Sequence, residues 1–273
     1  MNYTGYKYVQ KILLGLALML PAYSSYANLM ITPSRVVLDE RTRTTEVTLL
    51  NNSDTTKVYH IEWEQKQQKM NGAYTDIDES SNPYKADDMV RHSPRKVTIK
   101  PGEYQKIKLR ANFPRDLTDG EYRSHLLMRV VNDVLPVGDD AKTEGQKLVI
   151  IPLLSFSIPV MVRKGKVQTD SDITSIKPQK NKEGKKELQV SIKHNGNFSS
   201  YGNLYAYMKV GSGATEEIGK SHNIALFRET SQRIVNIPLQ VQDIPKGAVV
   251  QVLYKGDDEF EGKVLGKAAI RYE

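Results

Sequence analysis

The side chains that could perform chemistry are few and scattered in this sequence. The chain has five histidines and no cysteine, and no two histidines stand at a spacing typical of metal ligands. They are His60, His92, His125, His194 and His222. The sequence also lacks a G-x-S-x-G nucleophile elbow and a phosphate-binding P-loop. We therefore expect no catalytic residue, no metal and no cofactor, and we predict that the protein is not an enzyme.

Adjacent acidic residues are the other group that could act on a substrate. They occur as Asp87-Asp88, Asp139-Asp140 and Asp257-Asp258, each in a loop-like segment. Neighbouring side chains of an extended chain point to opposite sides, so such a pair is badly placed to act as a joint general acid and base. We interpret these pairs as solvated turns.

Short runs of β-branched and aromatic residues, separated by turn signals, dominate the rest of the chain. In "KVYHIEWE" the residues Tyr59, Ile61 and Trp63 alternate with polar ones, the period-two pattern of a half-buried strand. The polar segment 66–94 is expected to be loop. About seven such strands in each half indicate immunoglobulin-like sandwiches. We predict an all-β fold of two such domains, covering residues 28–165 and 166–273.

The first 27 residues have the features of a secretory signal peptide. Lys7 and Lys11 precede an apolar run over residues 12–19, and Ser25 and Ala27 form an A-x-A-like cleavage site. The run is shorter than the roughly 20 residues of a membrane-spanning helix. We expect cleavage after Ala27 and export across the inner membrane. Without cysteine, each domain must rely on a hydrophobic core instead of disulfides.

Charge and hydropathy limit the classes of partner. The formal net charge is +7, but lysines and acids are interleaved along the chain, which is typical of a solvated surface. We expect no nucleic acid partner. No later segment is long and apolar enough for a membrane span, so none is expected in the mature chain.

The least polar part of the mature chain is "KLVIIPLLSFSIPVMVRKG", residues 147–165. Every even position from Leu148 to Val162 is apolar, whereas the odd positions change from apolar to polar after Leu153. The first half of this strand is therefore apolar on both faces, which is unusual for a sandwich strand with one wet side. Two interpretations stay open: a central core strand, or a strand whose second face serves a partner.

Several segments resemble the PapD-like periplasmic chaperones that escort pilus subunits. In the first half the resemblance lies in "ITPSRVVLDE", "VTLLNNSDTTKVYHIEWEQ", "PRKVTIKPGEYQKIKLRANFP", "DGEYRSHLLMRVV" and "SFSIPVMVRKG". In the second half, "HNGNFSSYGNLYAYM" and "RETSQRIVNIPL" are similar to the alternative, or archaic, branch of the chaperone–usher system. The resemblance implies two immunoglobulin-like domains at an angle, with a cleft between them.

The resemblance also implies a function and partners. Such chaperones bind pilus or fimbrial subunits in the periplasm by donor-strand complementation and deliver them to an outer-membrane usher. An uncomplexed donor strand is an exposed edge, so a self-capping dimer is a reasonable expectation for the free protein. The alternative is a secreted structural or adhesive protein of a surface fibre. Only Asn28 to Met30 precede the first expected strand, too few for a fibre subunit's own donor extension, which favours the chaperone.

The resemblance places the donor strand in the apolar stretch. Aligned on Arg163, the subunit-binding side chains are Leu148, Ile150, Pro152 and Leu154. A shift by one residue would present Val149, Ile151 and Leu153 instead, because neighbouring side chains face opposite ways. We favour the even set for its longer apolar continuity. Pro152 constrains the register because proline donates no ladder hydrogen bond.

The resemblance further implies a cation that binds the carboxylate at the subunit's C-terminus. Arg35 matches this arginine by position, and its planar guanidinium can pair with both carboxylate oxygens. Classical members add a lysine on the donor strand, but Pro159 stands at the matching position here. Lys164, Arg129 and Arg123 are nearby candidates for the second cation, and the sequence does not select among them.

Arg163 matches a family arginine in an interdomain salt bridge. We expect a structural role for it, with an acidic partner at Asp257 or Asp258. A glutamate of the same network in classical members aligns with Arg123 here, so the sequence does not predict the full network.

Overall fold

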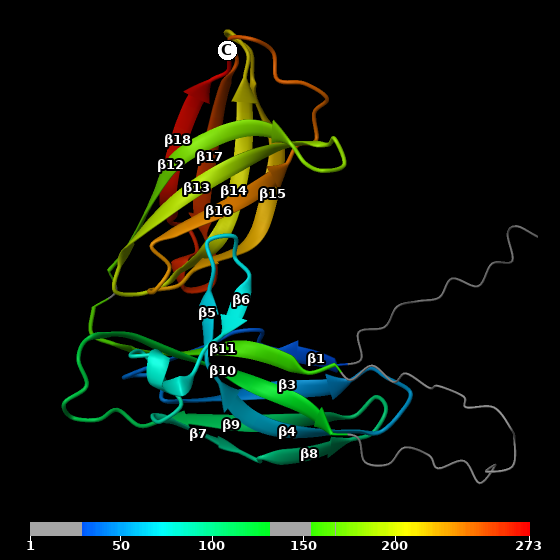
Figure 1. Cartoon of the computed structure of the whole chain (residues 1–273), viewed down its shortest axis with the longest axis vertical. Coiled ribbons are helices and arrows are strands. Elements are labelled where there is room, and N and C mark those ends of the chain that lie inside the picture. Colours follow the sequence, from blue (N-terminus) through cyan, green and yellow to red (C-terminus); the bar gives the residue numbers. More distant parts are fainter. Residues whose placement is uncertain (1–28, 132–153, 167) are drawn as a thin grey trace, which may run out of the picture.

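The computed structural model describes residues 29–131, 154–166 and 168–273. They form two β-sandwiches, as predicted (Figure 1). Within these residues there is no α-helix, only the short 3-10 turns η1 (Glu79–Ser81) and η2 (Asp258–Phe260). No helix in the described part is long and apolar enough to cross a membrane.

The first sandwich consists of two sheets and a small hairpin. The four-stranded sheet has the order β1 (Leu29–Thr32), β3 (Thr44–Asn51), β9 (Tyr104–Ala111), β7 (Val90–Ser93). The five-stranded sheet has the order β2 (Val36–Asp39), β11 (Phe156–Lys164), β10 (Gly120–Val131), β4 (Lys57–Glu64), β8 (Lys96–Ile99). The hairpin is β5 (Lys66–Gln68) and β6 (Tyr74–Asp76). All pairings are antiparallel except that of β2 with β11.

The second sandwich has a three-stranded and a four-stranded sheet. The first has the order β12 (Thr169–Lys180), β13 (Lys186–Gly196), β16 (Gln232–Pro238). The second has the order β15 (Thr215–Leu226), β14 (Ser200–Lys209), β17 (Val249–Gly256), β18 (Val264–Arg271).

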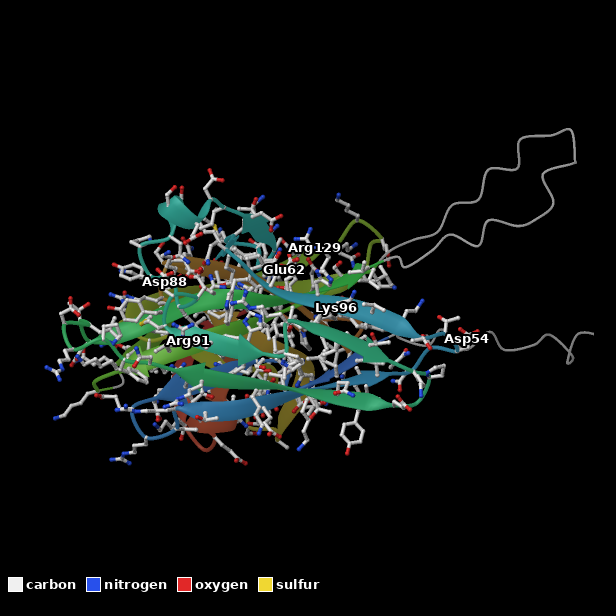
Figure 2. The ribbon with its side chains drawn as sticks, turned by 90° about the horizontal axis from the view of Figure 1, so that it is seen from below. Asp54, Glu62, Asp88, Arg91, Lys96 and Arg129 are labelled. Atoms are coloured by element: carbon white, nitrogen blue, oxygen red, sulfur yellow. The ribbon has the colours of Figure 1, made fainter. Side chains whose placement is uncertain are left out.

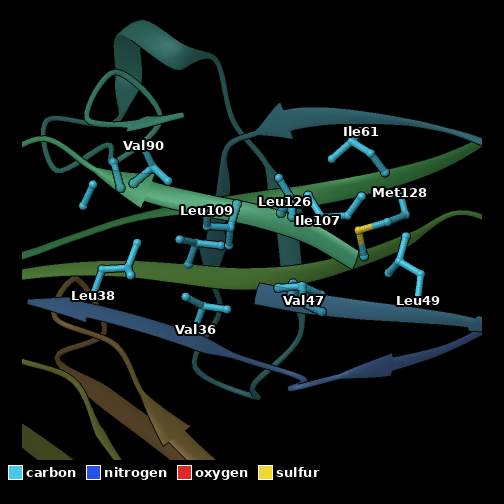
Figure 3. Close-up of a cluster of buried hydrophobic side chains, with 14 of the residues drawn as sticks. Val36, Leu38, Val47, Leu49, Ile61, Val90, Ile107, Leu109, Leu126 and Met128 are labelled. Atoms are coloured by element: carbon cyan, nitrogen blue, oxygen red, sulfur yellow. The ribbon is translucent and has the colours of Figure 1, made fainter. Parts of the chain in front are cut away.

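Each sandwich encloses its own core of alternating apolar side chains. In β9 the side chains of Ile107 and Leu109 point inward and are fully buried, whereas Lys106 and Lys108, which alternate with them, are exposed. Figure 3 shows the inner faces of the two sheets meeting around Val47 and Leu126. Each fully buried Leu or Ile stabilises the fold by about 1.5–3 kcal/mol relative to exposure. Two such cores replace the disulfides that the chain cannot form.

The segment 66–94, expected to be loop, is more ordered than its polarity indicates. It contains β5, β6, η1 and β7. The strands β5 and β6 were missed because each has only three residues, most of them polar, so neither shows an apolar period of two. In β7 only Val90 is buried in the core, and a single apolar position makes no pattern. Tertiary contacts hold them instead: Asn82 Nδ2 donates to Gln65 Oε1 at 2.8 Å.

The outside of the first sandwich carries charges of both signs. Figure 2 labels acids and bases that share this surface, and Arg129 of β10 pairs with Glu62 of β4 at 2.5 Å. Both side chains are well exposed, so the pair is screened by solvent and contributes little to stability. The mixed charge matches the solvated surface expected from the sequence.

Candidate functional site

Strand β11 is flanked on both sides over only part of its length. It pairs with β10 from Phe156 to Lys164, but β2 pairs only with Val160 to Arg163. Among the described strands, Phe156 to Pro159 therefore have a neighbour on one edge alone. Unpaired backbone groups along such an edge form a template for an additional strand.

The two faces of β11 serve different purposes. Ile158, Val160 and Val162 are buried in the core of the first sandwich. On the other face lie Ser157, Pro159, Met161 and Arg163, since neighbouring side chains alternate. Met161 and Arg163 are buried there, although this face is outside the core. The end of β11 is thus covered on both faces.

Three of the four predicted donor residues lie outside the described residues. They are Leu148, Ile150 and Pro152, and the alternative set of Val149, Ile151 and Leu153 lies outside them as well. The fourth, Leu154, stands two residues before β11 and is 55% exposed. An exposed leucine therefore directly precedes the part of β11 whose edge is open.

Pro159, where the resemblance implied a lysine, faces His125 across the β10–β11 pair. His125 is buried, and this burial, together with the charges of Arg123 and Lys66, lowers its pKa to about 2. The imidazole is therefore neutral at physiological pH and adds no positive charge. Its ring packs edge-on against Tyr74, with centroids 5.3 Å apart.

Arg35 is already paired with acids of the second sandwich. Its Nη2 donates to Glu259 Oε1 at 3.1 Å, and Nη1 lies 3.7 Å from Asp258 Oδ2. The guanidinium also stacks on the ring of Tyr201 at 4.2 Å. The Arg35 side chain is only 11% exposed, and its Nη1 is buried without a hydrogen-bond partner. Arg35 thus contributes to the contact between the sandwiches and keeps one donor unused.

Arg163 is the centre of a buried interdomain network. Its Nε donates to Glu121 Oε2 at 2.8 Å and its Nη1 to Glu259 Oε1 at 2.9 Å. Glu121 Oε2 also accepts from Ser199 Oγ at 2.8 Å and Ser199 N at 3.2 Å. Burial alone would lower the pKa of Arg163, but Glu121 and Glu259 outweigh it and raise the pKa. This network joins the two sandwiches at the end of β11.

The acid of the second sandwich that pairs with Arg163 differs from the two that the sequence suggested. Asp257 and Asp258 were expected, and the acid that binds it is Glu259. Asp257 instead caps η2 and accepts from Asn203 Nδ2 at 3.0 Å. The sequence did not predict the glutamate of the network, and the structure places Glu121 directly opposite Arg163 in the β10–β11 register. Only this register could have shown that Glu121 was the partner.

The three other candidate cations are engaged elsewhere. Arg129 pairs with Glu62, and Lys164 Nζ donates to the carbonyl oxygen of Leu117 at 2.5 Å. Arg123 pairs with Glu229 of the second sandwich, and its guanidinium lies 3.9 Å from the ring centroid of Phe227. A cavity of about 280 Å³ adjoins this pair, with Lys66, Tyr84 and Arg228 among its lining residues.

A wider hollow lies on the other side of the junction between the sandwiches. Its volume is about 810 Å³, and Arg163, Glu259 and Phe198 contribute to its wall. Asp39 and Lys166 also line it, so its wall carries charges of both signs. The structure thus leaves open space on two sides of the junction that Arg35, Arg123 and Arg163 stabilise.

The acidic pair Asp87-Asp88 lies beside a third carboxylate, Glu79, with ligand oxygens within 4.8 Å of one another. Lys85 pairs with Glu79, and its Nζ lies 2.7 Å from Asp88. The two exposed carboxylates Glu79 and Asp88 thus already share a cation, which is in keeping with the solvated turn expected from the sequence.

The chain is similar in fold to several solved chaperone structures. The YadV chaperone gives a TM-score of 0.47 at 13% identity, with 89% of this chain and 100% of that chain covered. The CupB2 chaperone of Pseudomonas aeruginosa gives 0.46 at 11% identity, covering 89% and 100%. The CsuC–CsuE complex of chaperone and tip adhesion subunit, from archaic Csu pili of Acinetobacter baumannii, gives 0.42 at 16% identity, covering 90% and 98%.

No protein-family model matches the chain, and no curated protein sequence matches it. The TM-scores of these three structures are all below 0.5. The functional proposal below rests on the residues of this chain.

Proposed function

We propose that this protein is a periplasmic chaperone that binds pilus or fimbrial subunits by donor-strand complementation and delivers them to an outer-membrane usher. The observation that carries the proposal is the open edge of β11. Its backbone between Phe156 and Pro159 pairs with β10 alone in the described part of the chain. The exposed Leu154 extends this edge into the apolar stretch that precedes it.

The chemistry of such an edge suits a partner that lacks a strand. Backbone hydrogen bonds along the edge would supply the pairing, and alternate side chains would fill apolar pockets of the subunit. In this proposal the donors are Leu148, Ile150, Pro152 and Leu154. Each Leu or Ile that fills a pocket contributes about 1.5–3 kcal/mol before ordering costs are subtracted.

Arg35 is proposed as the anchor for the subunit's C-terminal carboxylate. Its buried Nη1 has no hydrogen-bond partner and lies 3.7 Å from the exposed Asp258 carboxylate. An incoming carboxylate could take the place of Asp258 while Nη2 stays with Glu259. Replacing Arg35 by Ala should lower subunit recovery, and unchanged recovery would mean that the anchor is elsewhere.

The test is co-expression with a pilin-like subunit and purification of the complex from periplasm. We expect a stable one-to-one complex, lost when Ile150 and Leu154 are both replaced by Asp. A control is Ser155→Asp, which places one of these two charges on an exposed neighbour of the opposite face. A subunit that is equally soluble and abundant without this protein would refute the chaperone function.

A further inference from the structure

The β5–β6 hairpin leaves the first sandwich and lies against the second (Figure 1). It follows β4 after one residue, Gln65, and pairs only with itself in the described sheets. Its base is held by Lys66, whose Nζ lies 2.6 Å from Asp76 and 3.2 Å from Glu64. The hairpin is thus fixed to the first sandwich at one end and free to contact other elements at its tip.

The tip bonds to the backbone at the edge of a sheet in the second sandwich. Strand β16 pairs with β13 on one side, and on its other side Ile234 N donates to the carbonyl oxygen of Met70 at 2.7 Å. Next to it, Thr230 Oγ1 donates to Gln68 Oε1 at 3.1 Å. Gln68 is 6% and Thr230 4% exposed. Two polar groups buried to this degree rely on each other, because water does not reach them.

The hairpin also contacts side chains of the second sandwich. The Tyr74 ring lies 6.2 Å from that of Phe227, between centroids. At Gly72, an added Cβ would be 2.6 Å from Nη2 of Arg233. That guanidinium is half-buried and donates to the carbonyl oxygen of Ala225, so moving it aside would cost this hydrogen bond.

The hairpin and the Arg163 network are separate attachments between the sandwiches. The network joins the end of β11 to Ser199 and Glu259, whereas the hairpin joins β4 to β16 and its adjoining turn. Arg35 adds to the first attachment through Glu259. Arg123 adds to the second, because it pairs with Glu229 and also donates to the carbonyl oxygen of Lys66 at the base of the hairpin. Two attachments at different places restrict a rotation that either one alone would allow.

We propose that the β5–β6 hairpin is a latch that holds the second sandwich at a fixed angle to the first. Releasing the hairpin tip leaves the Arg163 network and the Arg123–Glu229 pair as contacts between the sandwiches. The second sandwich then samples a wider range of angles, and the width of the junction beside β11 varies with it. This inference concerns the geometry of the two sandwiches and does not depend on the proposed function.

The chain offers a matched pair of turns for the test. Lys69 to Ala73 at the hairpin tip and Asn181 to Lys185 between β12 and β13 have the same hydrogen bonds, first N–H to fifth carbonyl and fourth N–H to first carbonyl. Their glycines, Gly72 and Gly184, have φ of +84° and +77°. Gly72→Leu and Gly184→Leu therefore add the same backbone strain. Only Gly72 has neighbours within 4 Å of the new Cβ.

The readout is the distance between two spin labels, one on each sandwich. The chain has no cysteine, so cysteines placed at exposed Lys108 of β9 and Lys209 of β14 carry the labels specifically. We expect one narrow distance distribution for the parent and for Gly184→Leu, and a broad or displaced one for Gly72→Leu. Tyr74→Ala, which removes a contact without adding strain, should broaden the distribution as well.

The outcomes separate the latch from simple loss of folding. Trp63 fluorescence and far-ultraviolet circular dichroism, measured on the same samples, report whether the sandwiches stay folded. Folded Gly72→Leu and Tyr74→Ala variants with a distribution as narrow as that of Gly184→Leu would overturn the proposal. Equal broadening in both glycine variants would overturn it too, since strain alone would then explain the effect.

Discussion

Replacing Arg163 by Met should destabilise the protein far more than removing an exposed ion pair. The Glu121 side chain is 1% exposed and that of Arg163 is 6% exposed. Removing the guanidinium leaves the Glu121 carboxylate buried with two donors, both from Ser199. Breaking a buried pair by removing one partner costs about 3–5 kcal/mol. Because the Ser199 hydrogen bonds remain, we expect about 3 kcal/mol, at the lower end of this range.

The measurement is equilibrium unfolding in urea, followed by the fluorescence of Trp63. Trp63 is the only tryptophan of the chain, and it packs against the core of the first sandwich. Arg163 lies on β11 of the same sandwich. The control is Arg129→Met, which makes the same change in an exposed pair with Glu62. Such pairs contribute about 0–1 kcal/mol.

A second variant isolates the cause. Arg163→Met combined with Glu121→Met replaces the buried charges by apolar side chains, and such replacements are often close to neutral. We therefore expect the double variant to be more stable than Arg163→Met alone. The explanation would be wrong if Arg163→Met lost no more stability than Arg129→Met. It would also be wrong if the double variant had a lower free energy of unfolding than Arg163→Met alone.

Two further predictions concern protonation and packing. Burial lowers the pKa of His125 to about 2, below the roughly 6.5 of an unfolded histidine. Between these values the unfolded state binds more protons, so the free energy of unfolding should fall by about 1.4 kcal/mol per pH unit as pH drops below 6. Urea titrations should show a shallower slope for His125→Gln, and an unchanged slope in that variant would contradict the assignment. Gly202→Ala would drive a Cβ into the carbonyl oxygen of Lys255 and should cost about 1–3 kcal/mol or more. At Gly213 the single contact is at 3.0 Å, so a melting temperature no lower for Gly202→Ala than for Gly213→Ala would refute the clash.

The regular parts of the fold could be predicted because their patterns are local. Ile107 and Leu109 alternate with lysines, and this period of two is visible in any single strand. The β5–β6 hairpin carries no such pattern, and its order depends on partners more than 150 positions away, such as Thr230 for Gln68. Sequence distance conceals contacts of this kind.

For the candidate site, too, the local pattern could be read from the sequence, but the long-range contacts could not. The apolar character of residues 148–162 is a property of the sequence, but the open edge of β11 depends on where β2 begins to pair with it. The assignment of Arg35 to a cleft position did not anticipate that Glu259 would bind it. Which charges meet across two sandwiches is decided by their relative orientation.

The sequence by itself determined that the chain forms two β-sandwiches with separate cores, because alternation and turn residues specify strands locally. It also determined that neither core could use disulfides, because there is no cysteine. The tertiary structure decided the partners of Arg163. The register of β10 against β11 places Glu121 opposite it, and the packing of η2 brings Glu259 to it. Strand registers and domain angles depend on many contacts between residues that are distant in the sequence. A local pattern of residue types does not specify these contacts.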